Sequence, residues 1–327
     1  MDDNGGAFIV PVDVRIDRRG GKMSEQTSLR APRLWNWHRI ALFLPAMGLI
    51  GFFLIIPIGV IAIYSFLVPG VYGGVVWEFT TNAYRQFLFE QDLFTDEWAF
   101  NGAYLNIYGR SIGQAAVATI ACLLVGFPTA YFIATRPPEN RTIWLFLVTI
   151  PYWVNLLIRT LAVLFLLRDQ GPINSFLMDW GVIEKPIRLA YTNFAIGFGL
   201  VYSYLPFMVL PIYASLERFD FSLMEAGYDL YAGRWTILRK VVLPVVAPGV
   251  VAGSLLVFIP SLGSFIAPDI LGGGRNLMIG NLIALQFQGS RNWPFGSAAA
   301  MILLTLVLLA LFFFARRQQG GLASSHG

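Results

Sequence analysis

Six long stretches without a charged residue constrain the fold of this chain more than any other feature. They cover residues 40–77, 111–135, 142–158, 189–216, 241–268 and 292–315, and residues 160–167 extend the third stretch beyond Arg159. A helix of about 20 apolar residues crosses the hydrocarbon layer of a membrane. With 56% hydrophobic residues, the chain is too apolar for an ordinary soluble domain. We therefore predict an all-α membrane protein with six transmembrane helices.

Basic residues are distributed unevenly over the segments between these stretches. If the N-terminus is cytoplasmic, residues 1–39, 136–141, 217–240 and 316–327 carry 15 of the 23 Lys and Arg residues, and the external segments carry 7. Cytoplasmic segments of membrane proteins are rich in Lys and Arg. We therefore expect both termini in the cytoplasm. Residues 1–39 are expected to be a disordered tail, 40–316 the membrane domain and 317–327 a second tail, and Met1 and Met23 are both possible starts.

The residue content excludes several kinds of site. The chain has one cysteine, Cys122, and its two histidines lie near opposite ends, so neither a disulfide nor a Cys/His metal site is expected. It contains no GxxxxGK[ST] phosphate loop, so ATP-driven work would need another subunit. An intramembrane enzyme or a membrane scaffold is the alternative of another class, but the spans lack the paired carboxylates or His/Cys clusters of such enzymes. We predict no catalytic site, no metal and no cofactor on this chain.

One polar stretch, LMEAGYDLYAGRWTILRKVVLP at residues 223–244, interrupts the apolar second half of the chain. Its apolar residues recur near helical spacing, while Glu225 and Asp229 stay polar. This pattern predicts two short amphipathic helices along the membrane surface, with bends at Gly227 and Gly233. Such a loop either rests on lipid headgroups or receives a partner protein.

The spacing of this loop favours a partner protein. Glu225-Ala226 and Leu243-Pro244 stand at a fixed distance before the penultimate span, and the loop resembles the EAA loop of binding-protein-dependent ABC importer permeases. In that family the motif forms a coupling helix that sits in a cleft of the ATPase subunit. Tyr231 replaces the usual Gly, so we expect the turn to move to Gly233. The resemblance assigns ATPase coupling, within residues 217–244, to Glu225, Ala226, Gly227, Asp229, Tyr231, Gly233, Leu243 and Pro244.

Other stretches resemble the PotB/PotH-type permeases of spermidine/putrescine importers, over about residues 40–316. They include PYWVNLLIRT at 151–160, SYLPFMVLPIYASLERFD at 203–220 and LGGGRNLMIGNLIALQF at 271–287. The resemblance implies the type I (MetI-like) permease fold and a place in the bacterial inner membrane. It also implies three partners: a second permease, cytoplasmic ATPase subunits that hold ATP and Mg²⁺, and an extracytoplasmic solute-binding protein. We therefore expect the chain to form, with the second permease, a path for polyamines; the alternative is another small organic solute, because related permeases carry such solutes.

A path for polyamines needs carboxylates and aromatic faces, because ammonium groups leave water only for such partners. Asp269, which closes an uncharged run before three glycines, is the first candidate for a contact with the solute. The weaker candidates are Glu184, Trp153, Tyr202 and Tyr204. Anchoring at the membrane interface is the more common role of a Tyr or Trp in a span.

Arg159 is a charge inside the third stretch, and we assign it a structural role. A charge within a membrane is costly unless it reaches water or finds a partner. We expect Arg159 either to extend to the outer surface or to pair with an acid such as Asp269.

Overall fold

The structure, a computed structural model, describes residues 37–91, 98–274 and 276–323. Residues 1–53 and 54–327 form two compact units. Helix α1 (Trp37–Tyr64) begins in the first unit and ends in the second. The predicted tail at residues 1–39 lies almost entirely outside the described residues.

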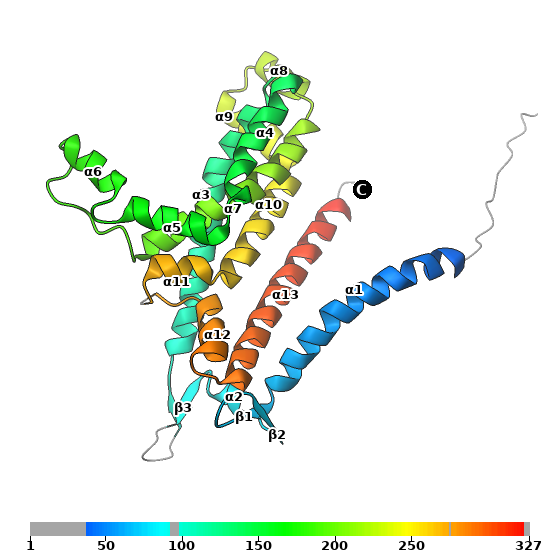
Figure 1. The fold of residues 1–327 in the computed structure, drawn as a ribbon. Coiled ribbons are helices and arrows are strands. Elements are labelled where there is room, and N and C mark those ends of the chain that lie inside the picture. Colours follow the sequence, from blue (N-terminus) through cyan, green and yellow to red (C-terminus); the bar gives the residue numbers. More distant parts are fainter. Residues whose placement is uncertain (1–36, 92–97, 275, 324–327) are drawn as a thin grey trace, which may run out of the picture. The chain divides into compact units, whose positions relative to one another are not determined.

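The second unit is mostly helical (Figure 1). After α1 its elements are β1 (Leu67–Pro69), β2 (Val75–Phe79), α2 (Asn82–Arg85), β3 (Phe89–Gln91), β4 (Trp98–Phe100), α3 (Ala103–Ala134), α4 (Pro138–Trp153), α5 (Leu156–Leu167), α6 (Pro172–Asp179), α7 (Asn193–Glu217), α8 (Ser222–Asp229), α9 (Arg234–Ile237), the π-helical turn η1 (Leu238–Val242), α10 (Leu243–Gly263), α11 (Ile266–Gly272), α12 (Ile279–Gln288) and α13 (Trp293–Ala323).

Five helices in the described part of the chain are long and apolar enough to cross a membrane. They are Met47–Tyr64, Ala103–Ala134, Asn193–Glu217, Arg234–Gly263 and Trp293–Phe312. A sixth span results if α4 and the segment after it count as one. The structure therefore agrees with the predicted helical membrane protein and gives five or six spans.

The third predicted span is not the single helix that its composition suggested. α4 and the segment from Leu156 meet at an angle of 91°, because Val154 and Asn155 have extended ψ values of 138° and 135°. The side chain of Asn155 then caps α5 by accepting a hydrogen bond from Leu157 N at 2.9 Å. Asn is a preferred N-cap residue, so the sequence starts a new helix here although the apolar run continues.

The first apolar stretch also ends as a helix earlier than predicted. α1 stops at Tyr64, and residues 67–79 form an antiparallel hairpin of β1 and β2. Gly73 and Gly74, in the connecting turn, have φ values of +100° and +79°, which glycine adopts without steric cost. A second hairpin pairs β3 with β4. The predicted external segment therefore contains strands as well as loop.

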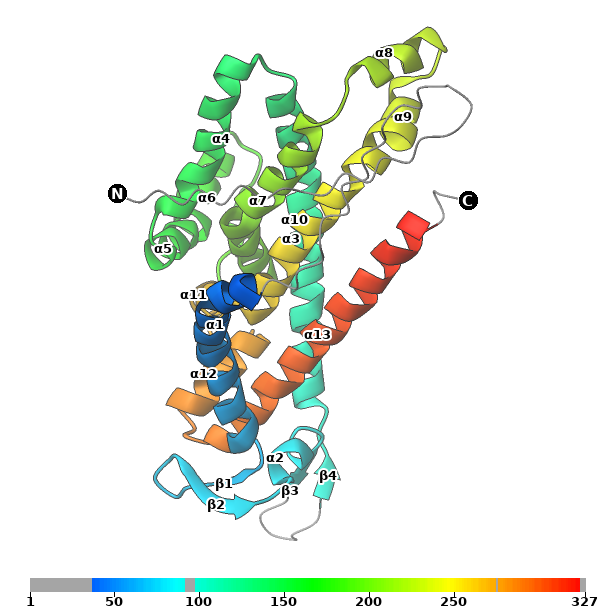
Figure 2. The ribbon, with the colours of Figure 1, turned by 90° about the vertical axis from the view of Figure 1, so that its right-hand side faces the viewer.

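Helices α3, α7 and α10 pack against one another and enclose the main core (Figures 1 and 2). Their close approach depends on small residues. A Cβ on Gly249 of α10 would lie 2.5 Å from Pro211 O of α7 and would also meet Ser215 Oγ. Small residues at helix contacts are typical of membrane proteins. Cys122 is buried in this core, where it acts as a small packing residue.

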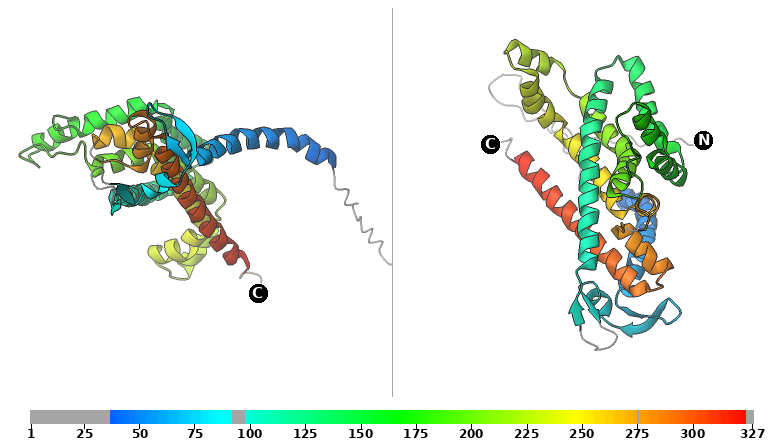
Figure 3. Two further views of the ribbon diagram at one scale, coloured as in Figure 1. Left: turned by 90° about the horizontal axis from the view of Figure 1, so that it is seen from below. Right: turned by 90° about the vertical axis from the view of Figure 1, so that its left-hand side faces the viewer.

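α3 connects two different ends of this helical group (Figure 3). Its 32 residues correspond to a length of about 48 Å. The hairpins precede its first turn, and near its last turn Tyr131 Oη contacts Met224 Sδ of α8 at 4.0 Å. The loop 223–244 therefore lies at the opposite end of α3 from the hairpins.

Candidate coupling loop and solute-path residues

The polar stretch 223–244 forms α8, a tight turn and the start of a long helix. α9 continues through η1 into α10, so that Arg234–Gly263 is one helix of 30 residues. The prediction of a second short helix along the membrane surface is therefore wrong, because the helical pattern runs on into the span without a terminator. A force on α9 acts directly on a transmembrane helix that packs against α3 and α7.

The π-helical turn η1 precedes Pro244, in the first turn of α10. Proline has no N–H to donate, and its ring crowds the carbonyl four residues earlier, which belongs to Lys240 within η1. Single π-helical turns are rare and are frequent at functional sites. Leu243 and Pro244, the predicted end of the coupling motif, therefore mark the junction between loop and span.

The beginning of α8 presents acidic groups to solvent. Asp220 accepts a hydrogen bond from Ser222 N at 3.0 Å, and this bond holds the pKa of Asp220 below its usual value. Glu225 lies in the first turn of α8, where a negative charge interacts favourably with the helix dipole. Glu225, Ala226 and Asp229 are all exposed, so they are available to a partner protein.

Gly227 allows α8 to pack closely against α9. A Cβ at this position would lie 3.1 Å from Cγ1 of Ile237, a side chain that is buried. The second Ala of the EAA pattern would therefore press on Ile237. The absence of that Ala is explained by the packing of the two helices.

The turn between α8 and α9 lies at Tyr231, and its predicted displacement to Gly233 is wrong. Ala232 N donates to Gly227 O at 3.1 Å and Tyr231 N to Tyr228 O at 2.9 Å, the paired bonds of a Schellman motif. This motif requires a left-handed residue at the position after the C-cap, and Tyr231 has φ +57°. Gly233 has φ −68° and is the N-cap of α9. The hydrogen bonds that end α8 fix the turn, although Tyr is poorly suited to this conformation.

Asp269 is exposed on α11 and lines a pocket of about 370 Å³. Asn281 and Gln288 of α12 line the same pocket. The Asn281 side chain donates to Phe265 O at 2.9 Å and so ties the start of α12 to the start of α11. A carboxylate and two amides provide several acceptors for an ammonium group. Sequence reasoning missed both amides, although they are two of the three polar side chains of the otherwise apolar α12.

Two of the three glycines after Asp269 form the turn that follows α11. Gly273 and Gly274 have φ values of +60° and +72°. A Cβ on Gly273 would lie 2.7 Å from Cδ1 of Tyr191, so this turn also lies against the residues before α7. Both the left-handed backbone and the close approach require glycine.

Arg159 is only 5% exposed, so it does not extend to the surface. Its Nη1 donates to Pro151 O at 3.1 Å, and its guanidinium lies 5.8 Å from the centre of the Tyr152 ring. The described residues include no ion pair between Arg159 and Asp269, so neither expected arrangement is present. The break after α4 folds Arg159 back over the last turn of that helix, where free carbonyls and the helix dipole favour a cation.

We expect Arg159→Met to lower the free energy of unfolding by about 1.5–3 kcal/mol, because a buried, charge-assisted hydrogen bond is lost. Arg168→Met is the control, since Arg168 ends α5 as an exposed residue, and we expect a change within about 0.5 kcal/mol. Unfolding of the detergent-purified chain, followed by tryptophan fluorescence, measures both effects. Equal effects of the two substitutions would contradict this role of Arg159.

The remaining candidates for the solute path do not converge on one site. Tyr204 Oη donates to Pro260 O at 3.3 Å, and its ring lies 6.3 Å from Phe207. Trp153 and Tyr202 are exposed, and Glu184 lies on the exposed loop after α6. Within the described residues, no recorded contact joins Asp269, Glu184 and Tyr204. The structure therefore groups Asp269 with Asn281 and Gln288 and does not bring the other candidates to the same pocket.

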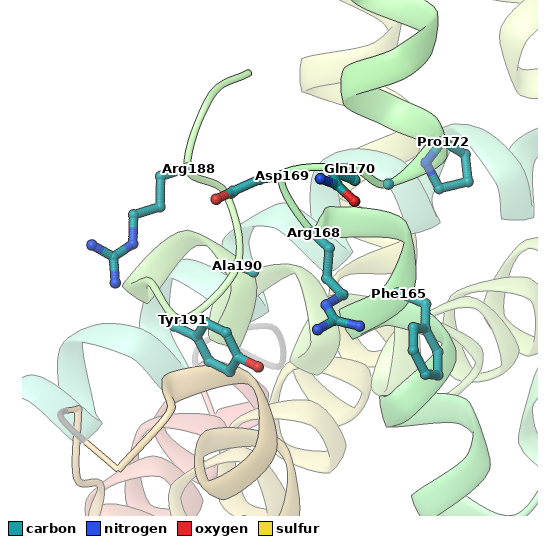
Figure 4. A pocket seen from close by; sticks show the side chains of 9 residues that line it. Phe165, Arg168, Asp169, Gln170, Pro172, Arg188, Ala190 and Tyr191 are labelled. Atoms are coloured by element: carbon teal, nitrogen blue, oxygen red, sulfur yellow. The ribbon is translucent and has the colours of Figure 1, made fainter. Parts of the chain in front are cut away.

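A second pocket, of about 780 Å³, lies between the end of α5 and the loop that leads to α7 (Figure 4). Arg168, Arg188 and Tyr191 line it. The buried Asn174 side chain joins its two walls, since it donates to Arg168 O at 3.2 Å and to Ile187 O at 2.9 Å. The lining carries two arginines against one carboxylate, Asp169, so its net positive charge is unfavourable for a polyamine, because like charges repel. Their proximity could not be predicted, since tertiary hydrogen bonds bring them together.

The family model and the similar proteins that match this chain agree with each other. Residues 102–320 match the family described as binding-protein-dependent transport system inner membrane component. The chain is 43% identical over 197 residues to the spermidine/putrescine transport system permease protein PotB of Escherichia coli (strain K12), over 60% of this chain and 72% of PotB. PotB of Haemophilus influenzae is also 43% identical, over 201 residues, 62% of this chain and 70% of that protein.

A solved structure has a similar fold. It is a bacterial alginate ABC transporter in complex with an alginate pentasaccharide-bound periplasmic protein. The comparison gives a TM-score of 0.57 at 18% identity, over 86% of this chain and 95% of that chain. At this identity the likeness concerns the fold alone.

Proposed function

Because this chain belongs to the family of binding-protein-dependent transport system inner membrane components, we propose that it is a permease subunit of an ATP-driven importer of spermidine and putrescine. The observation that carries the choice of solute is the 43% identity to PotB over 72% of the length of PotB. The chain has a transport role and no catalytic site of its own. A second permease completes the path, and a solute-binding protein outside the membrane delivers the solute.

The coupling loop explains how such a chain would use ATP that it does not bind. Separate cytoplasmic ATPase subunits hold ATP and Mg²⁺ and receive α8, whose Glu225 and Asp229 are exposed. Their closure would shift α8 and α9 together, because Ile237 of α9 packs against Gly227 of α8. α9 is continuous with α10, so this movement would act directly on the core formed by α3, α7 and α10.

The Asp269 pocket is the part of this chain that best suits a polyamine. A polyamine carries ammonium groups separated by short apolar chains, so it binds to carboxylates flanked by apolar walls. Asp269 supplies the carboxylate, while Leu277 and Leu285 supply apolar lining. The pocket lined by Arg168, Asp169 and Arg188 carries a net positive charge and suits a polyamine less.

We also propose that both termini and the coupling loop face the cytoplasm. A reporter fused after Arg317 should be active only in a form that works in the cytoplasm, and one inserted in residues 171–185 only in a form that works outside. The bias of 15 to 7 basic residues supports this orientation. The reverse reporter pattern would place residues 223–244 outside and would exclude their contact with an ATPase.

A further inference from the structure

The residue at the tip of the coupling loop is unfavourable for the chain taken alone. Tyr231 occupies the left-handed position of the Schellman motif, with φ +57°. Helices commonly end with glycine there, because a Cβ is strained in this conformation. Gly233 lies only two residues further along but has an ordinary φ of −68°. The chain therefore holds a bulky residue where glycine would relax the turn.

Among the residues that the structure describes, no side-chain contact compensates for this strain. The side chain of Tyr231 is 99% exposed, and the described residues give it neither a hydrogen bond nor a ring partner. Leu230 and Trp235, at 81% and 72% exposure, lie on either side of it. Exposed Tyr and Trp side chains of this kind are enriched among the residues that dominate protein interfaces.

The charge of α8 indicates a protein rather than lipid as the occupant of this tip. α8 carries Glu225 and Asp229 and no basic residue, and the basic residues of the loop, Arg234, Arg239 and Lys240, lie beyond the tip in α9 and η1. The cytoplasmic surface of a membrane is itself negative and attracts basic segments. An acidic helix with an aromatic tip fits a protein cleft with an apolar floor and basic groups at its rim.

We propose that Tyr231, flanked by Leu230 and Trp235, is the anchor that the ATPase subunit receives, and that it determines which ATPase this permease accepts. This inference rests on the proposed function, since it names the residue through which the coupling loop binds its partner. The backbone strain at Tyr231 is retained because the side chain is buried only in the complex.

The test uses the complete permease pair in lipid nanodiscs and measures the affinity of its ATPase subunit. Tyr231→Gly relaxes the turn, so the variant is expected to fold normally, yet the affinity should fall roughly thirtyfold, as for loss of an interface hot spot. Tyr231→Phe should stay within about threefold of the parent, since the ring is kept. The matched control is Tyr72→Gly in the β1–β2 turn, where Tyr72 is 90% exposed and no change is expected.

A parental affinity of the Tyr231→Gly variant overturns the inference. Glu225→Lys, measured in parallel, separates this outcome from failure of the proposed function. If Glu225→Lys weakens binding and Tyr231→Gly does not, the loop binds the ATPase without this anchor. If neither changes the affinity, the loop is not the ATPase site. If Tyr231→Gly leaves the affinity unchanged and its one effect is that a lipid-soluble quencher reaches Trp235, the tip rests on lipid. The inference is then wrong.

Discussion

Glu225→Lys is expected to abolish ATP-driven transport while leaving the chain folded and inserted in the membrane. Glu225 is exposed at the start of α8, so within the described part of the chain its replacement removes only a favourable charge near the helix dipole. In the complex, reversal of a charge at a closely packed contact costs several kcal/mol. A loss of this size corresponds to an affinity lower by a hundredfold or more. Transport and co-purification of the ATPase should fail together.

The control for this variant is Glu78→Lys. Glu78 is an exposed glutamate of β2, among the hairpins at the other end of α3. Co-purification of the ATPase should be the same for this variant as for the parent. Normal transport with Glu225→Lys would contradict the role of the loop, and loss of the ATPase with both variants would indicate general misfolding.

Asp269→Asn is expected to lower polyamine uptake about ten- to a hundredfold. The substitution removes the one charged side chain that lines the pocket. Asn has nearly the same size as Asp, so the shape of the pocket is preserved. Loss of a carboxylate contact in a partly dry site costs about 1.5–3 kcal/mol. Uptake of labelled putrescine and spermidine by cells measures the effect, and co-purification of the subunits shows that the complex still assembles.

Asp179→Asn is the matched control for this prediction. Asp179 ends α6 and is also an exposed aspartate, but it lies outside the Asp269 pocket. Uptake by this variant should equal that of the parent. An assembled Asp269→Asn complex that imports both polyamines at the parental rate would exclude Asp269 from the path.

Sequence reasoning predicted the features that depend on composition and spacing. The helical membrane class and the family are confirmed, and the coupling loop stays a prediction. Sequence reasoning failed where backbone dihedral angles determine how a helix ends or bends. Apolarity does not distinguish a straight helix from two helices at 91°, because Val154 and Asn155 bend the chain without any change in hydrophobicity. It likewise placed the turn at Gly233 and not at Tyr231.

The site was less predictable than the fold because tertiary contacts define it. Asp269 could be selected from the sequence. Asn281 lines the same pocket only because its side chain donates a hydrogen bond to Phe265 O, which holds α12 against α11. Arg159 was expected to need a carboxylate or water. The carbonyl of Pro151 serves instead, and this arrangement exists only because the broken span folds back on itself.

The central claim is that this chain helps to move polyamines across the membrane at the expense of ATP. The most direct measurement is uptake of labelled spermidine and putrescine into proteoliposomes that hold this chain, its second permease and the ATPase, with the solute-binding protein on the opposite side of the membrane from the ATPase. Our account predicts accumulation of both polyamines that requires ATP on the ATPase side and the binding protein, and no accumulation of an anionic solute such as glutamate. An active complex that hydrolyses ATP and transports another small organic solute, but neither polyamine, would contradict it.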